Sequence, residues 1–128
     1  MKKESLKLFF YKDSQLFKKV VIKEDFSLML GSSSNCDLII SNKRISRNHC
    51  QIIYSNSGEL KLIDLNSTNG TFLNGIKLKS EKTYNLNIKD QVQLAGLSGI
   101  LMSVGSENTQ SRDLDSQKNI LELFKNKN

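Results

Sequence analysis

Two short polar segments, each set between apolar segments, are the feature that most constrains the fold of this chain. Residues 46–49 read Ser-Arg-Asn-His, and residues 66–71 read Asn-Ser-Thr-Asn-Gly-Thr. Serine, asparagine and glycine favour turns, because their side chains bond to nearby backbone groups or because glycine accepts positive φ angles. The flanking apolar residues alternate with polar ones, which is typical of strands with one buried face. The sequence therefore predicts a β-scaffold that displays two polar loops.

The same alternation recurs along most of the chain. The apolar positions that follow it are Leu6, Leu8 and Phe10; Phe26, Leu28 and Leu30; Leu38 and Ile40; Val92 and Leu94; and Ile100, Met102 and Val104. Turn-forming residues separate these segments at 12–14, 23–25, 56–58, 74–75 and 89–90. Such spacings suit antiparallel hairpins, and the chain has no proline to interrupt a ladder. We therefore predict an all-β sandwich.

Length and composition indicate one domain. With 128 residues and 38% hydrophobic side chains, the chain can build a single core, and we expect the domain to occupy residues 1–105. No apolar run is long enough to cross a bilayer or to act as a secretory signal, so we expect a cytoplasmic protein without membrane insertion. Cys36 and Cys50 stand beside apolar strand residues. This indicates unpaired, buried thiols, with a disulfide as the alternative.

The formal net charge is +6. Residues 107–128 carry equal numbers of basic and acidic side chains, so the whole surplus lies on residues 1–106. A basic domain attracts phosphorylated peptides, nucleic acids or membrane surfaces, or is simply well solvated, and charge alone does not choose among these. Nucleic acid is the weaker hypothesis, because the exposed aromatic platform of single-strand binders is not evident in the sequence.

Residues 31–75 resemble the forkhead-associated (FHA) family. The shared features, in the family's order and spacing, are the Gly-x-x-x-x-Cys-Asp run that starts at Gly31, the Ser-Arg-x-His loop, the Asn-Gly-Thr loop and the second Asn-Gly at Asn74-Gly75. The resemblance covers about residues 4–105. It implies an FHA-like antiparallel two-sheet β-sandwich with its ligand-binding loops at one end. It also implies a phosphothreonine-peptide-binding module that acts in kinase-linked signalling or assembly.

The resemblance assigns ligand contacts to four loop residues. Ser46 and Arg47 would bind the phosphate, Thr68 would add a contact near the phosphothreonine, and Asn69 would hydrogen-bond the main chain of the ligand. These residue types suit that chemistry, because a guanidinium fork and hydroxyl donors form charge-assisted hydrogen bonds with phosphate. An amide can donate and accept at once. A plain turn role is the alternative for Ser46.

Other residues of the loops are expected to shape the site. The resemblance makes His49 a structural residue that fixes the loops by hydrogen bonds, with a catalytic or metal-binding role as the alternative. Gly70 and Gly75 each follow an asparagine and suit positive φ angles in tight turns, as does the Asn74-Gly75 pair as a whole. Gly31 ends a predicted strand in a similar way.

One residue departs from the family pattern. FHA domains usually carry an arginine directly after the first glycine, and this chain has Ser32 there. Serine brings one hydroxyl and no charge, so Lys43 or Arg44 would be auxiliary phosphate contacts beside Arg47. Two hypotheses remain open: a phosphothreonine receptor with a weakened phosphate site, and a degenerate FHA domain that binds an unmodified protein or itself. The oligomeric state stays open as well.

The sequence indicates a binding protein rather than an enzyme, without cofactor or metal. It contains no phosphate loop with a lysine, no zinc-type Cys/His spacing, no nucleophile elbow and no paired carboxylates in a recognisable frame. Asp37 and Asp64 flank predicted strand ends, where they would cap loops, and neither has a clustered acidic partner for a cation.

Residues 106–128 differ in composition from the rest. A polar linker of small residues comes first, and an amphipathic helix could follow, capped by Asp113 or Asp115. Its apolar stripe would consist of Leu114, Ile120, Leu121 and Phe124. A short helix of this kind needs a surface to pack on. A helix folded back on the same domain, a frayed tail and a partner-binding peptide are the alternatives.

Overall fold

The computed structural model describes residues 6–23, 25–96 and 100–106, and the regular elements in these ranges are strands. In chain order they are β1 (Leu6–Lys12), β2 (Gln15–Ile22), β3 (Phe26–Gly31), β4 (Leu38–Ile39), β5 (Cys50–Tyr54), β6 (Leu60–Asp64), β7 (Thr71–Leu73), β8 (Ile76–Lys77), β9 (Thr83–Leu86), β10 (Gln91–Leu94) and β11 (Ile100–Ser106).

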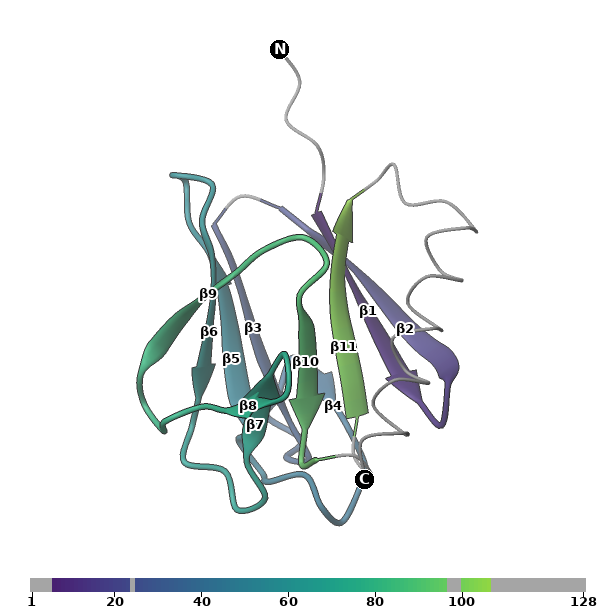
Figure 1. Cartoon of the computed structure of the whole chain (residues 1–128). Helices are drawn as coiled ribbons and strands as arrows, with labels where there is room; N and C mark the ends of the chain where they lie inside the picture. Colours follow the sequence, from purple (N-terminus) through teal and green to yellow (C-terminus); the bar gives the residue numbers. More distant parts are fainter. Residues whose placement is uncertain (1–5, 24, 97–99, 107–128) are drawn as a thin grey trace.

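The strands form two packed sheets (Figure 1). The first, here called sheet A, has the order β2-β1-β11-β10-β7-β8, and sheet B has the order β4-β3-β5-β6-β9. Every pair in sheet A is antiparallel, as are the pairs of β3 with β5, β5 with β6 and β6 with β9. The predicted all-β, FHA-like two-sheet sandwich is therefore confirmed.

One strand pair departs from the predicted antiparallel pattern. Strand β4 runs parallel to β3, with Leu30 opposite Leu38. The connecting loop folds back so that the chain returns alongside the strand it has just left. The Asp37 amide donates to the Met29 carbonyl at 2.9 Å, and the Asp37 carboxylate accepts from the Met29 amide at 2.8 Å. This local pairing holds a connection that is too short for an ordinary parallel crossover.

The core lies between the two sheets. Alternate residues of each strand point inward, and the largest side chains without solvent exposure include Leu8, Phe10, Leu30, Ile52 and Leu62. They form one continuous cluster, because the period of two places every second residue on the same face of a strand. A smaller cluster of Phe9, Tyr11 and Leu101 is separate from this core.

The predicted turn glycines behave in two different ways. Gly70, in the loop before β7, has a φ angle of 89°. Asn74 and Gly75 have φ angles of 50° and 86°, as the two-residue hairpin between β7 and β8 requires. Gly31 ends β3, as the sequence predicts, but it is not among the described residues with positive φ, so the expected likeness to the turn glycines is wrong. A Cβ atom at Gly31 would lie 2.0 Å from the Arg47 carbonyl oxygen and 2.9 Å from Cys36 Sγ. Gly31 is needed because backbone approaches backbone there.

The predicted linker and helix at 106–128 lie outside the described residues, apart from Ser106, which ends β11. The part of the chain that the structure describes contains no helix able to span a bilayer.

A first prediction follows from the close approach at Gly31. Gly31→Ala is expected to lower the free energy of unfolding by about 1–3 kcal/mol, the usual range for overpacking, because the Arg47 carbonyl cannot move away without breaking its loop. It should also shift the amide NMR signals of residues 46–49. Urea denaturation and an amide correlation spectrum would measure both.

Gly75→Ala is the matched control. A Cβ atom at Gly75 meets nothing within 4 Å, and only its positive φ opposes the substitution, so stability should fall without any shift at residues 46–49. If both variants left the signals of residues 46–49 in place, the close approach would not position that loop.

Candidate functional site

Three loops meet at one end of the sandwich, the lower end in Figure 1. The Ser32 amide donates to the Ser46 carbonyl at 3.0 Å, which joins the β3–β4 loop to the β4–β5 loop. The Ser46 hydroxyl oxygen accepts from the Thr68 amide at 2.9 Å, which joins the β4–β5 loop to the β6–β7 loop. Ser46 is thus the residue at which all three loops are connected.

Arg47 has a fixed backbone and an exposed side chain. Its carbonyl oxygen accepts from the Ser33 amide at 3.1 Å and from the Cys36 thiol at 3.0 Å. No group of the described residues forms a hydrogen bond with its guanidinium, which is therefore available for an anionic ligand. A rigid attachment point with a free charged end lowers the ordering cost of binding.

Thr68 and Asn69 follow one another at the tip of the β6–β7 loop. Thr68 is exposed and Asn69 is half-buried. The Asn69 side-chain amide donates to the Arg44 carbonyl at 2.8 Å, which ties this loop to the β4–β5 loop a second time. Its side-chain oxygen and its second N–H remain for a ligand, so Asn69 can still donate and accept at once.

The candidate auxiliary cations differ from each other. Lys43 is exposed and extends into solvent. Arg44 is exposed too, but its Nε donates to the Ala95 carbonyl at 3.3 Å, so its guanidinium is directed towards the end of β10. Ser32 is half-buried beside Ser46. Its side chain supplies only a hydroxyl, whereas an arginine at this position would bring a positive charge to the same loop junction.

His49 is fully buried between the β4–β5 and β6–β7 loops. Its Nδ1 accepts from the Ser46 amide at 3.1 Å, so Nε2 carries the proton and donates to the Gly70 carbonyl at 2.9 Å. Burial lowers the pKa of the imidazole, while the Gly70 hydrogen bond and the Asp64 charge oppose this shift without cancelling it. The geometry makes His49 a clamp between two loops and leaves it no contact with solvent.

Asp64 organises the β6–β7 loop more extensively than its expected role as a simple loop cap. The buried carboxylate accepts from the Ser67 hydroxyl and the Thr71 hydroxyl, both at 2.6 Å, from the Ser80 hydroxyl at 3.0 Å and from the Ser67 amide at 3.2 Å. Burial alone would raise the pKa of Asp64, but these hydrogen bonds together hold it below the usual range. The contact with Ser80, distant in sequence, leaves no local signal in the sequence.

The described residues offer no metal site: in these ranges no group of three or more His, Cys, Asp or Glu side chains is placed to hold a cation. Cys36 and Cys50 are both free and buried, as the sequence predicts. Burial raises the pKa of the Cys50 thiol far above its ordinary value. Such a thiol stays protonated and behaves as a small apolar side chain.

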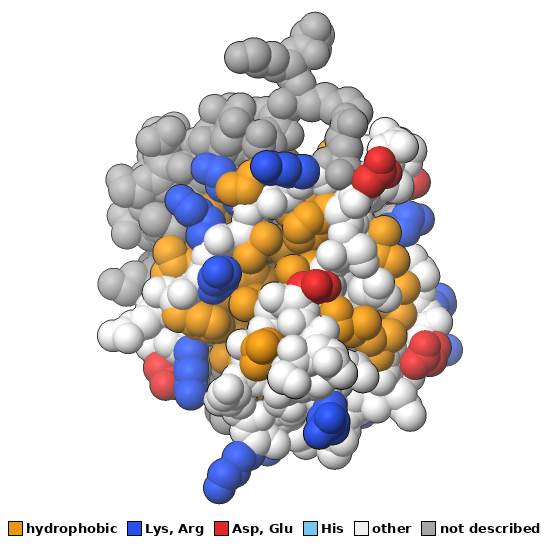
Figure 2. All heavy atoms as spheres, turned by 180° about the vertical axis from the view of Figure 1, so that it is seen from behind, with side chains coloured by type: hydrophobic (Ala, Val, Ile, Leu, Met, Phe, Trp, Pro, Cys, Tyr) orange, Lys and Arg blue, Asp and Glu red, His pale blue; other side chains and the backbone are white. Residues whose placement is uncertain are grey.

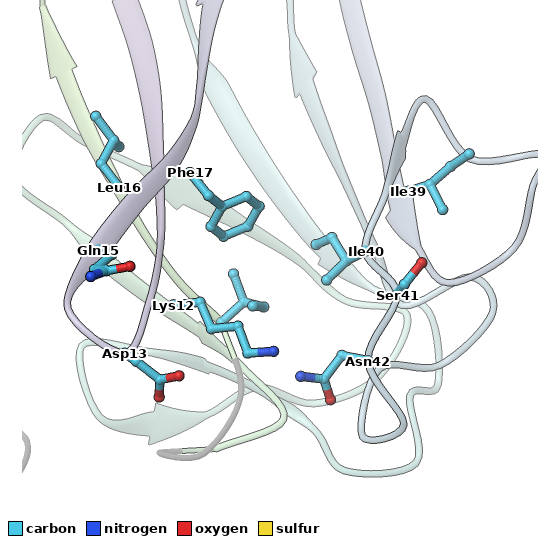
Figure 3. A pocket seen from close by; sticks show the side chains of 10 residues that line it. Lys12, Asp13, Gln15, Leu16, Phe17, Ile39, Ile40, Ser41 and Asn42 are labelled. Carbon is cyan, nitrogen blue, oxygen red and sulfur yellow. The ribbon is translucent and has the colours of Figure 1, made fainter.

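A hollow of about 540 Å³ lies beside the start of the β4–β5 loop (Figure 3). Phe17 and Ile40 face one another across it, and Leu16 and Ile39 line its sides. Lys12 is the one cation in its lining. Its wall combines apolar and polar side chains, whereas the donors suited to phosphate are on the three loops.

The second prediction concerns the single histidine, whose Cε1–H NMR signal is unambiguous. We expect its pKa to lie below 6.5, the ordinary value for histidine, because the ring is buried. A lowered pKa in the folded state means that the unfolded chain binds more protons, so stability is complete above about pH 6.5 and falls as the pH drops below it.

His49→Ala removes both hydrogen bonds and should cost about 2–4 kcal/mol of stability. It should also remove the part of the pH dependence of stability that arises between the pKa of His49 in the folded protein and its pKa in the unfolded chain. Denaturation at pH 7.5 and 5.5 tests this, and a histidine signal that titrates at or above 6.5 would contradict the clamp.

Comparison with known proteins places this geometry in a family. A family model for the FHA domain matches residues 28–95. The human "Nuclear inhibitor of protein phosphatase 1" is 35% identical over 83 residues, which are 63% of this chain and 24% of that protein. The chain therefore spans about a quarter of the length of this relative.

Solved structures agree with the family match. The FHA domain of an Arabidopsis thaliana hypothetical protein has 28% identity and a TM-score of 0.69, covering 84% of this chain and 89% of that one. A structure from a study of phosphothreonine-dependent FHA domain interactions has a TM-score of 0.65 and 23% identity, covering 82% of this chain and 99% of that one. With its sandwich, its connected loops and a family match over more than half of its length, this chain belongs to the FHA domain family.

Proposed function

We propose that this chain binds phosphothreonine peptides through the three connected loops, with a phosphate site that is weaker than usual because Ser32 supplies no charge. The observation that carries the proposal is the exposed Arg47 guanidinium beside two hydroxyl groups whose loops are tied together by the hydrogen bond from the Thr68 amide to Ser46 Oγ. FHA domains are interaction modules, and we infer no catalytic activity.

The donors of the site match a phosphate dianion. Ser46 Oγ is an acceptor for the Thr68 amide, so its own O–H is free to donate outward. The Thr68 hydroxyl is exposed and can donate from the neighbouring loop, while Arg47 supplies the fork of N–H groups. Asn69 would then bind the main chain of the peptide beyond the phosphate. Three donors from two fixed loops favour a phosphorylated ligand over an unmodified one.

The serine at position 32 removes one cation from the phosphate site but leaves others, so we expect weak rather than absent phosphopeptide binding. Arg44 is directed towards Ala95, so Lys43 is the remaining cation free to approach the phosphate. Arg47 and Lys43 would then neutralise the dianion, and of these two the backbone of Arg47 is held by hydrogen bonds to its carbonyl. Phosphate-independent binding of a protein partner, or self-association, is the alternative that the experiments below would reveal.

The proposed setting is kinase-linked signalling or assembly. The human relative is by name an inhibitor of protein phosphatase 1, and phosphothreonine-dependent interactions have been studied for an FHA domain of the same fold. A cytoplasmic location remains the prediction from the sequence, with the nucleus as the alternative that the name of that relative suggests.

The third prediction tests Arg47. A phosphothreonine-peptide library and its unphosphorylated copy would first select a peptide for calorimetry. Arg47→Ala should then weaken binding by about 1.5–3 kcal/mol without unfolding the chain, because the side chain is exposed and makes a charge-assisted contact.

Arg44→Ala is the matched control for charge. It removes the same net charge from the same loop, but from a side chain held at Ala95, so it should cost clearly less affinity. Unchanged binding in Arg47→Ala, or equal losses in both variants, would overturn phosphate recognition by Arg47.

The fourth prediction restores the missing charge. Ser32→Arg places a guanidinium at the junction with Ser46 and should increase the affinity for the phosphothreonine peptide about ten- to a hundredfold, with no gain for the unphosphorylated copy. The gain should shrink as the salt concentration rises, because a partly exposed ion pair is screened.

Ser34→Arg adds the same charge two residues along the same loop, at an exposed position, and should give a much smaller gain. If folded Ser32→Arg protein showed no phosphopeptide binding at low salt, the phosphate-reading function would fail and the phosphate-independent function would replace it.

A further inference from the structure

The outer face of sheet A carries an apolar cluster where a two-layer sandwich would normally meet water. On β1, Leu8 and Phe10 belong to the core, so Phe9 and Tyr11 point to the opposite face. Leu101 is paired directly with Tyr11 in the ladder between β1 and β11 and joins the same cluster. These three side chains form a contiguous apolar surface, here called the outer cluster.

The outer cluster is as well buried as the core. Phe9, Tyr11 and Leu101 are only 4%, 7% and 5% exposed. The outer face of sheet B behaves differently, because Met29 and Ile53 at its centre are half-exposed. Figure 2 shows the molecule from behind, and apolar side chains reach the surface there among charged and other polar groups. The two outer faces of the same sandwich are therefore covered to different extents.

Polar groups beside the outer cluster are buried as well. Gln91 is the first residue of the neighbouring strand β10, next to the core residue Val92, and its register partner is Ser103 of β11. Its side chain is 4% exposed, and within the described part of the chain neither its side-chain nitrogen nor its side-chain oxygen has a hydrogen-bond partner. Burial also raises the pKa of Tyr11, although a hydrogen bond with Ser103 opposes this. A buried amide without a partner is costly, so this face is suited to a covering segment that brings polar groups.

We propose that residues 107–128 of the same chain pack against the outer cluster as an amphipathic helix. Strand β11 lies at the centre of this face and ends at Ser106, so the segment starts on the face that it would cover. About 13 helical residues span roughly 20 Å, which is about the length of a seven-residue strand. The segment can thus return along β11 with a short linker to spare.

The composition of the segment matches the surface. With Leu114 as origin and 100° per residue, Leu121, Phe124 and Ile120 fall within an arc of about 120°. This arc would contact the outer cluster, and Gln117, which falls within the same arc, would face the Gln91 amide. The equal numbers of basic and acidic residues in the segment mean that apolar contact, rather than net charge, would hold it.

A matched pair of leucines in the full-length chain tests the proposal. Leu121 lies in the apolar arc, whereas Leu123 lies about 160° from Leu121 and about 60° outside the arc. Leu121→Asp should lower the melting temperature by about 5 °C or more, the shift expected from losing a buried leucine in a domain of this size. Leu123→Asp should change the melting temperature by no more than about 1 °C.

NMR spectra of the same variants locate the contact. Leu121→Asp should shift the amide signals of Phe9, Tyr11 and Leu101, while those of Met29 and Ile53 on the other sheet should stay in place. Equal effects of the two leucine variants, or shifts spread evenly over both sheets, would overturn the proposal. Sedimentation that showed a dimer dissociated by Phe9→Asp, but not by Leu121→Asp, would identify a second copy as the occupant and would overturn it as well.

This inference does not depend on the proposed function. Because the outer cluster lies on a sheet face and the ligand loops lie at the end of the sandwich, Leu121→Asp should leave phosphopeptide affinity within about twofold at a temperature where the protein is folded. A complete loss of peptide binding in folded Leu121→Asp protein would place the segment in the recognition surface instead, contrary to the proposal.

Discussion

The site of this FHA domain depends on one neutral imidazole. His49 accepts from the Ser46 amide and donates to the Gly70 carbonyl at the same time, which only the neutral ring can do. A protonated ring would place two N–H donors face to face at Ser46. Burial in the sandwich, which lowers the pKa of His49, therefore maintains the protonation state that keeps two loops in register, and the bond from Thr68 to Ser46 depends on that register.

The β6–β7 loop has a second buried support, Asp64, which acts independently of His49. Together the two residues separate the groups that stabilise the loops from the groups that would contact a ligand. Asp64 holds Ser67 and Thr71 from beneath the loop, while Arg47 and Thr68 at the tip remain exposed. Since the loop conformations are set by buried groups, the exposed residues can change at little cost to folding. Ser32, which is only half-buried, is not one of these buried supports, so the chain can carry a serine where the family usually has an arginine and keep the same sandwich.

Sequence patterns predicted the features that local chemistry determines, and they failed where distant segments meet. The apolar residues at every second position, such as Leu8 and Phe10, identified β1. The Asn-Gly turns were found because left-handed φ angles favour those residues. Strand β2 escaped the pattern, because most of its side chains are exposed at the edge of sheet A and its pairing with β1 shifts register. The true reason for Gly31, contact with the backbone of Arg47, could not be distinguished from a turn.

Long-range and short-range electrostatics act on different steps of the proposed binding. The surplus of positive charge lies on residues 1–106, and such a field attracts an anionic peptide from a distance, which raises the association rate. Contacts made after docking, such as those of Arg47, mainly determine dissociation. A serine at position 32 removes one charge from the field but a whole ion pair from the docked complex. Its main effect would therefore be on dissociation, and the site would bind phosphopeptides quickly and release them quickly, as reversible assembly requires.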